Sequence, residues 1–241
     1  MKVIIVKDYD ELSELAANMV KQQVFAKPNS VLGLATGSSP IGMYKNLIRF
    51  NQEELVSFKK VETYNLDEYC GISKEHPQSY YYFMHENFFN HIDIDEKNIH
   101  IPSTIFNNLE QECAEYNKAL NNTKIDLQIL GIGSNGHIGF NEPGTPFDQE
   151  TFVVELTEKT RIDNKRFFNS LEEVPTHAVT MGIKNILNSG KIVMLISGEG
   201  KAEAAYKLLK GPVTVDFPAS ILQKHPDAII IIDEKAAKLI K

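Results

Sequence analysis

The stretch from Leu130 to Gly144, LGIGSNGHIGFNEPG, gathers the side chains of this chain that are best suited to proton chemistry. It places Asn135, His137 and Glu142 among several glycines. A histidine titrates near neutral pH and can carry a proton, and a neighbouring carboxylate orients it and stabilises its charged form. Glycine lets the backbone come close to a ligand. The stretch therefore predicts an acid–base site formed by Asn135, His137 and Glu142.

The same stretch matches G-x-G-x-x-G, the letters of a dinucleotide-binding loop, over Gly131–Gly136. That loop works only where a helix starts inside the glycine motif. Here Gly139 and the pair Pro143-Gly144 follow within a few residues, and both disfavour a long helix. We therefore reject a nicotinamide site and expect no cofactor.

A metal site is another arrangement that Asp67, His137 and Glu142 could form. No His-x3-His pair or similar ligand spacing accompanies them. The sequence therefore favours acid–base chemistry and predicts no metal ligand.

Two adjacent carboxylates, Asp67 and Glu68, follow a short apolar run. A partly buried carboxylate there could act as a general base with a raised pKa. A solvated acidic turn or a helix cap is the commoner use of such residues. Neighbouring side chains on an extended segment point in opposite directions, so at most one of the two faces a pocket. The sequence leaves open which one it is.

The segment Thr36-Gly37-Ser38-Ser39-Pro40 has the composition of an anion-binding loop. Backbone N–H groups, the hydroxyls of Thr36, Ser38 and Ser39, and the start of a following helix could together hold a phosphate. Pro40 suits the first turn of that helix. A capped helix start explains the same residues equally well. The loop is no Walker A motif, because G-K-[ST] is absent.

Cations could complete a phosphate site. Lys201 follows Ser197-Gly198-Glu199-Gly200, where two glycines open the backbone beside it, and Arg161 and Arg166 lie in a polar, weakly periodic segment. Basic side chains bind phosphate through charge-assisted hydrogen bonds. We favour Lys201 for this role and expect Arg161 to be a solvated charge.

The elements that must position these side chains alternate along the chain. Apolar runs predict strands, and amphipathic patterns predict helices, the first with Asp8 as its N-cap. The strands are expected at Lys2–Val6, Val31–Ala35, Val61–Tyr64, Ile125–Leu130, Lys191–Ile196 and Ala228–Ile232. The helices are expected at Tyr9–Phe25, from about Pro40, and at Gln78–Asn90, Leu109–Asn121, Gly200–Lys210 and Glu234–Lys241.

Strands that are apolar on both faces and alternate with helices indicate a parallel sheet covered on both sides. We therefore predict an α/β fold, a three-layer α/β/α sandwich with a mostly parallel, Rossmann-like sheet. A single domain, 1–241, is expected, with residues 147–176 forming a lid. Ligands of such sheets bind beyond the carboxyl ends of the strands, where the loops described above lie.

The composition argues against nucleic acids and membranes as partners of this chain. The 241 residues carry a formal net charge of −7, which argues against a nucleic-acid-binding protein. No stretch approaches the ~18 apolar residues of a membrane helix, and the first residues do not form a signal peptide. Cys70 and Cys113 have no metal-ligand spacing, so we expect free thiols in a reducing compartment, the cytoplasm.

Taken in order along the chain, these motifs resemble the glucosamine-6-phosphate deaminase family. The resemblance rests on LGLATGSSP at 32–40, NLDEY at 65–69, the 131–143 loop, Thr160-Arg161 with Arg166-Phe167-Phe168, and Gly198 with Lys201-Ala202. Together they span nearly the whole chain. The resemblance implies conversion of glucosamine 6-phosphate and water to fructose 6-phosphate and ammonia in amino-sugar catabolism, without a redox cofactor.

The resemblance also implies a role for each site residue. His137 would open the sugar ring, supported by Glu142 and Asn135, and Asp67 would move a proton from C2 to C1. Where many members have Asp, this chain has Asn135, which can only orient or hydrogen-bond its neighbour. Thr36, Gly37, Ser38, Ser39, Arg166 and Lys201 resemble the family's phosphate contacts.

One segment departs from the family pattern. Hexameric members that are activated by N-acetylglucosamine 6-phosphate carry an Arg-x-Lys-Thr segment, whereas this chain has Phe152-Val153-Val154-Glu155. We therefore expect no such activation and leave open whether the chain is a monomer or a homo-oligomer. Two alternatives remain: a sugar-phosphate-sensing effector domain, which would need neither His137 nor Asp67, and a related 6-phosphogluconolactonase.

Overall fold

A computed structural model describes residues 1–104, 108–158, 161–162, 165, 168 and 170–240 of the chain. Its centre is a seven-stranded sheet in which every neighbouring pair of strands is parallel. In spatial order the strands are β1 (Lys2–Val6), β10 (Ala228–Asp233), β9 (Lys191–Ile196), β6 (Leu127–Leu130), β2 (Val31–Leu34), β3 (Glu62–Asn65) and β5 (Ile99–His100).

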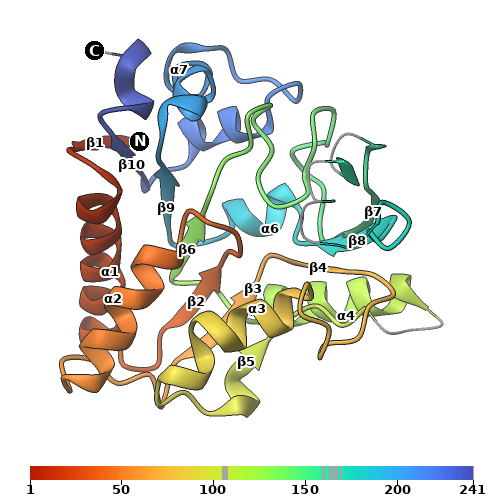
Figure 1. The fold of residues 1–241 in the computed structure, drawn as a ribbon, viewed down its shortest axis with the longest axis horizontal. Coiled ribbons are helices and arrows are strands. Elements are labelled where there is room, and N and C mark those ends of the chain that lie inside the picture. Colours follow the sequence, from red (N-terminus) through yellow and green to blue (C-terminus); the bar gives the residue numbers. More distant parts are fainter. Residues whose placement is uncertain (105–107, 159–160, 163–164, 166–167, 169, 241) are drawn as a thin grey trace.

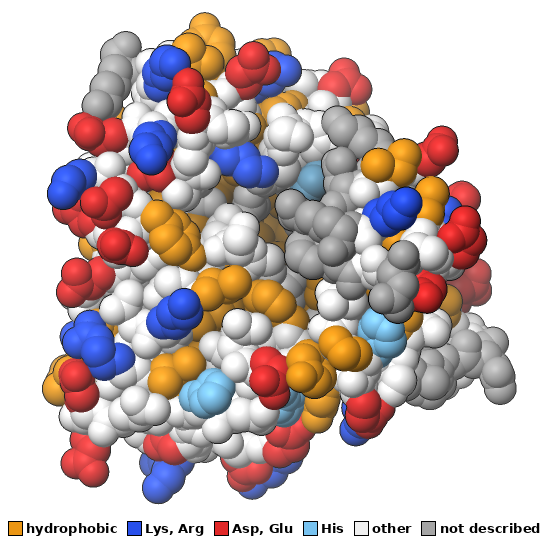
Figure 2. All heavy atoms as spheres, viewed as in Figure 1, with side chains coloured by type: hydrophobic (Ala, Val, Ile, Leu, Met, Phe, Trp, Pro, Cys, Tyr) orange, Lys and Arg blue, Asp and Glu red, His pale blue; other side chains and the backbone are white. Residues whose placement is uncertain are grey.

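Helices cover both faces of this sheet (Figure 1). One apolar core lies between the sheet and α1 (Tyr9–Ala26), α2 (Ile41–Gln52) and α3 (Tyr80–Asn87). The other lies between the sheet and α4 (Leu109–Asn122), α6 (Ile183–Leu187) and α7 (Ala202–Lys210). The predicted three-layer α/β/α sandwich with a parallel sheet is confirmed. Figure 2 shows charged side chains gathered mainly around the rim of one face.

A second, three-stranded antiparallel sheet was not predicted. It consists of β4 (Asp67–Tyr69), β8 (His177–Thr180) and β7 (Phe152–Glu155), in that order. β4 follows β3 after a single residue, Leu66, so the chain passes directly from the parallel sheet into the antiparallel one. The segment predicted as a lid thus contributes β7 to a regular sheet.

Most predicted elements are found close to their expected bounds, and Asp8 is the N-cap of α1, as predicted. Two predicted helices differ from their expected bounds. α3 begins only at Tyr80, because Ser79 caps it, and the last predicted helix is a 3₁₀ turn at Ala236–Leu239. Further 3₁₀ turns lie at Phe89–His91, Glu96–Asn98, Glu199–Lys201 and Pro218–Lys224. Within the described residues, no helix is long and apolar enough to cross a membrane.

Candidate active site

A cleft of about 490 Å³ lies beyond the carboxyl ends of the parallel strands. The loops after β2, β3 and β6 line it, together with Lys201 from the segment after β9. The chain order reverses between β2 and β6, since β3 and β5 lie on one side of β2 and β6 on the other. A parallel sheet opens a ligand crevice at such a switch point. The four predicted loops are therefore brought together.

His137 reaches the cleft from the glycine-rich segment after β6. Between Gly131 and Gly144 the chain forms turns and no helix, as its glycines and Pro143 predicted. The backbone N–H of Gly133 donates to the carbonyl oxygen of His137 at 2.9 Å, which closes the segment into a compact loop. This loop presents the imidazole to the cleft with about a third of its surface exposed.

Asn135 and Glu142 stand behind His137 rather than in the cleft wall. The Nδ1 atom of His137 lies 3.6 Å from Oε1 of Glu142. Asn135 joins the two, because its Oδ1 accepts the backbone N–H of His137 at 3.2 Å and its Nδ2 donates to Oε2 of Glu142 at 2.6 Å. The three predicted residues thus form one cluster, in which a carboxylate faces an imidazole and an amide fixes their spacing.

Asp67 lines the cleft as the first residue of β4. Its side chain is buried, and it pairs in register with Thr180 of β8. Burial, with a smaller contribution from the charge of Glu68, raises the pKa of the Asp67 carboxyl to about 8. A carboxyl that gains its charge only near neutral pH can take up and return a proton, which is what a general base needs.

Glu68 points away from the cleft. The sequence left open which of the two adjacent carboxylates faces the pocket, and it is Asp67. Its carboxylate accepts backbone N–H groups of Tyr69, Tyr80 and Tyr81 at 2.8, 2.9 and 2.8 Å. Glu68 therefore binds backbone at the start of α3, whose N-cap is Ser79, while Asp67 lines the cleft.

Aromatic side chains form one wall of the cleft beside Asp67. The rings of Tyr69 and Tyr80 lie 4.8 Å apart between centroids, and Phe140 stacks on Tyr80 at 6.1 Å. None of these three rings was among the predicted site residues. Alternation could have revealed Tyr69, because it is two residues from Asp67 on one strand and so shares its face.

The Thr36–Ser39 loop and Lys201 lie in the lining of the same cleft. Pro40 is the N-cap of α2 and no side-chain hydrogen bond caps this helix, so the interpretation of these hydroxyls as a helix cap is wrong. The Lys201 Nζ donates to the Ile132 carbonyl at 2.8 Å, and burial lowers the pKa of its ammonium. This end of the cleft therefore offers hydroxyls, the start of a helix and a positioned cation to an anion.

The two arginines have different outcomes. Arg161 donates to the carbonyl oxygens of Leu171 and Val174 at 2.9 and 3.1 Å, so it ties a loop together and is not the solvated charge that we expected. Arg166 lies outside the described residues.

Cys70 and Cys113 are both free, as predicted. Within the described part of the chain, no three His, Cys, Asp or Glu side chains are grouped as a metal site.

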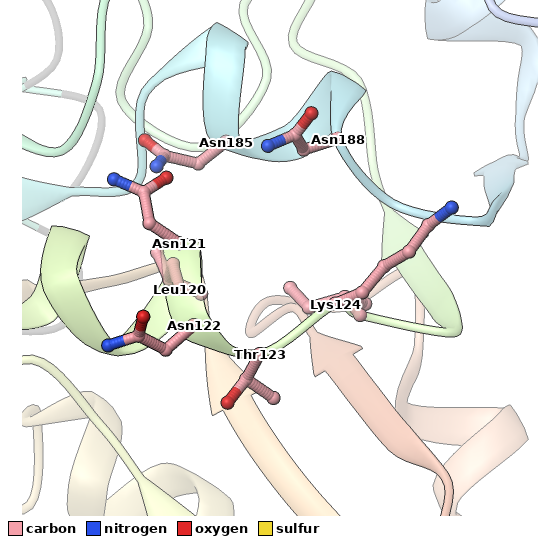
Figure 3. Close-up of a pocket in the computed structure, with 8 residues that line it drawn as sticks. Leu120, Asn121, Asn122, Thr123, Lys124, Asn185 and Asn188 are labelled. Carbon is pink, nitrogen blue, oxygen red and sulfur yellow. The ribbon is translucent and has the colours of Figure 1, made fainter.

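A second hollow, of about 290 Å³, lies where α4 and α6 end (Figure 3). Its lining is rich in asparagine, including Asn121, Asn122, Asn185 and Asn188. It contains no predicted site residue and lies at the amino ends of β6 and β9, opposite the cleft. The acid–base groups therefore belong to the first cleft alone.

The chain is similar to known proteins along most of its length. Residues 8–231 match the family model described as glucosamine-6-phosphate isomerases/6-phosphogluconolactonase. A glucosamine-6-phosphate deaminase of Thermoanaerobacter pseudethanolicus is 56% identical over 241 residues, covering 100% of this chain and 95% of the relative.

Solved structures are similar to the chain over nearly its whole length. A monomeric glucosamine-6-phosphate deaminase matches with a TM-score of 0.96 at 49% identity, covering 99% of this chain and 100% of that one. The 6-phosphogluconolactonase of Trypanosoma brucei matches with a TM-score of 0.80 at 16% identity, covering 100% and 98%. The second likeness shows a shared fold alone.

Proposed function

The chain belongs to the family of glucosamine-6-phosphate isomerases and 6-phosphogluconolactonases, and from that premise we propose that it is a glucosamine-6-phosphate deaminase. It converts glucosamine 6-phosphate and water to fructose 6-phosphate and ammonia. The observation that carries the proposal is that a buried carboxyl, Asp67, and an imidazole, His137, line one cleft together with Lys201 and the Thr36–Ser39 loop.

The first step is opening of the sugar ring. His137 takes the proton of the C1 hydroxyl and returns it to the ring oxygen, which leaves a C1 aldehyde and a C5 hydroxyl. Glu142 stabilises the transient positive charge on the imidazole, from 3.6 Å. Asn135 holds both groups in place and moves no proton itself.

Asp67 then carries a proton between carbons. Its carboxylate removes the proton from C2 while the proton of the C2 ammonium passes to O1, which turns the open-chain amino aldehyde into an enolamine with a C1 hydroxyl. The protonated Asp67 then delivers the C2 proton to C1, which leaves an iminium at C2. Water adds to this iminium, and ammonia leaves as the C2 ketone of fructose 6-phosphate forms. A buried base with a pKa of about 8 suits this step, because it can release the proton as readily as it takes it.

The substrate phosphate binds where Thr36–Ser39 and Lys201 line the cleft. The Thr36–Ser39 backbone and hydroxyls, with the N-terminus of α2, receive the phosphate oxygens, and Lys201 neutralises their charge. We further propose that the chain is a single domain with residues 147–176 as its lid. We also propose that the reaction takes place in the cytoplasm, where the free thiols of Cys70 and Cys113 stay reduced.

The test is a comparison of substrates with the purified chain. Glucosamine 6-phosphate should release ammonia in step with fructose 6-phosphate, and 6-phosphogluconolactone should be hydrolysed no faster than by buffer. Lactone hydrolysis without ammonia would replace the deaminase by the lactonase. Binding of glucosamine 6-phosphate without either product would favour a sensor.

A further inference from the structure

Glu68 uses both oxygens of a buried carboxylate on backbone donors. Oε1 accepts from Tyr69 and Tyr80, and Oε2 accepts from Tyr81. The residue is only 5% exposed. Tyr69 belongs to β4, whereas Tyr80 and Tyr81 are the first residues of α3, so one side chain fastens the strand to the helix.

This carboxylate completes the N-terminus of α3. The first backbone N–H groups of a helix have no partner within it, and they carry a partial positive charge. Ser79 accepts the N–H of Tyr82 at 2.9 Å, and Glu68 accepts those of Tyr80 and Tyr81. The connection from Cys70 to Ser79 is thereby closed at both ends, and its last residues, Pro77, Gln78 and Ser79, line the cleft.

Asp67 lies on the same three-residue strand. It faces the cleft because Glu68 faces the other way, and its register opposite Thr180 depends on where β4 lies. We propose that Glu68 is a positioning residue: by fastening β4 to the start of α3, it fixes Asp67 and the Pro77–Tyr80 wall relative to the substrate. The inference rests on the proposed function, since it takes Asp67 as the base.

Glu68 also acts on Asp67 through its charge, although the two side chains point in opposite directions. The phenols of Tyr69 on β4, Tyr80 on α3 and Tyr116 on α4 also interact electrostatically with Asp67. Burial raises the pKa of Tyr69 to about 12 and those of Tyr80 and Tyr116 well above the ordinary value, so all three are neutral near pH 8. His137 lines the cleft with Asp67. The Glu68 charge raises the pKa of Asp67, so its removal should lower the pH at which the base ionises.

The experiment compares Glu68→Gln with wild type. Hydrogen exchange at the Tyr80 and Tyr81 amides reports the clamp, and a carboxyl NMR titration of Asp67 reports its charge state. We expect exchange to quicken about tenfold or more, as one carboxylate hydrogen bond is lost. The Asp67 midpoint should fall below that of wild type. The kcat for ammonia release should fall about tenfold to a hundredfold, with a smaller change in KM, as expected when a reacting group is misplaced.

Asp93→Asn is the matched control. Asp93 accepts the backbone N–H of Phe58 at 2.7 Å and the Asn51 amide at 2.7 Å, near the amino end of β3 and away from the cleft. This variant should lose stability without moving the Asp67 midpoint or kcat. Glu68→Asp keeps the charge on a shorter side chain, so it should retain the midpoint and still lose amide protection. If Glu68→Gln does not fold, this variant carries the test of the clamp alone.

The outcomes separate the two proposals. Unchanged amide protection, Asp67 midpoint and kcat in the Glu68 variants would overturn the positioning role. A wild-type chain that releases no ammonia would overturn the deaminase, while the exchange and titration measurements would still decide whether Glu68 holds β4 and α3 together.

Discussion

Gly133 lies directly against the imidazole of His137: a Cβ placed on Gly133 would come within 2.3 Å of the ring atoms Nδ1 and Cε1. No real Cβ tolerates such a contact, so the ring occupies the space that any side chain at position 133 would need. Gly133 and His137 are therefore one structural unit, in which the glycine leaves room for the imidazole.

Gly133→Ala should displace the imidazole. We expect kcat/KM for ammonia release to fall at least about tenfold, and the free energy of unfolding to fall by about 1–3 kcal/mol, as for other overpacked sites. Steady-state kinetics and urea denaturation measure the two effects. Gly200→Ala is the control, because a Cβ there meets nothing within 4 Å. Equal activity of both variants would show that the close packing does not hold the ring.

Asp67→Asn should stabilise the fold at high pH. The Asp67 pKa is about 8 in the folded chain, against an ordinary value of 3.8. Between these values the folded state binds more protons than the unfolded state, so this group lowers stability as pH rises and its effect levels off above pH 8. Denaturation at several pH values should show little difference at pH 4 and a growing advantage of the variant toward pH 8. A constant difference would mean that Asp67 is ionised in the folded chain throughout.

Lys201→Met should weaken binding of the substrate phosphate. Loss of a charge-assisted hydrogen bond costs about 1.5–3 kcal/mol, so KM for glucosamine 6-phosphate should rise roughly tenfold or more, with a smaller change in kcat. Lys210→Met removes an exposed cation from the last turn of α7, the helix that follows Lys201, and should leave KM as it is. A kcat effect without a KM effect would move Lys201 from phosphate binding to the chemical step.

N-acetylglucosamine 6-phosphate should not activate the enzyme. Phe152–Glu155 forms β7, paired with β8, and this stretch carries no cation for an effector phosphate. Initial rates at low substrate, with and without the effector, should be equal apart from competition at the cleft. A rise in rate would show that an effector site exists elsewhere in the chain.

The sequence was sufficient for six of the seven strands of the parallel sheet, all except the two-residue edge strand β5, and for the loops that form the cleft. Apolar runs such as Lys191–Ile196 are local signals, and the topology of a parallel sheet then brings their carboxyl ends to one edge. The cluster of Asn135, His137 and Glu142 was also predictable, because all three lie within one short loop.

Features that depend on distant partners were not predictable. The orientation of Asp67 and Glu68 follows from pairing of β4 with β8, whose residues lie more than a hundred positions later. Arg161 lies in a polar segment and was expected to be a solvated charge. In the structure it donates to the carbonyl oxygens of Leu171 and Val174. No local pattern encodes either contact.

The central claim is that Asp67 is the base that moves the C2 proton. The most direct measurement is the kcat for ammonia release by Asp67→Asn, whose substrate binding is checked by calorimetry. Asn keeps the size of the side chain and removes its basicity, so kcat should fall roughly a hundredfold or more while glucosamine 6-phosphate still binds. Turnover equal to that of wild type, with binding intact, would contradict the account.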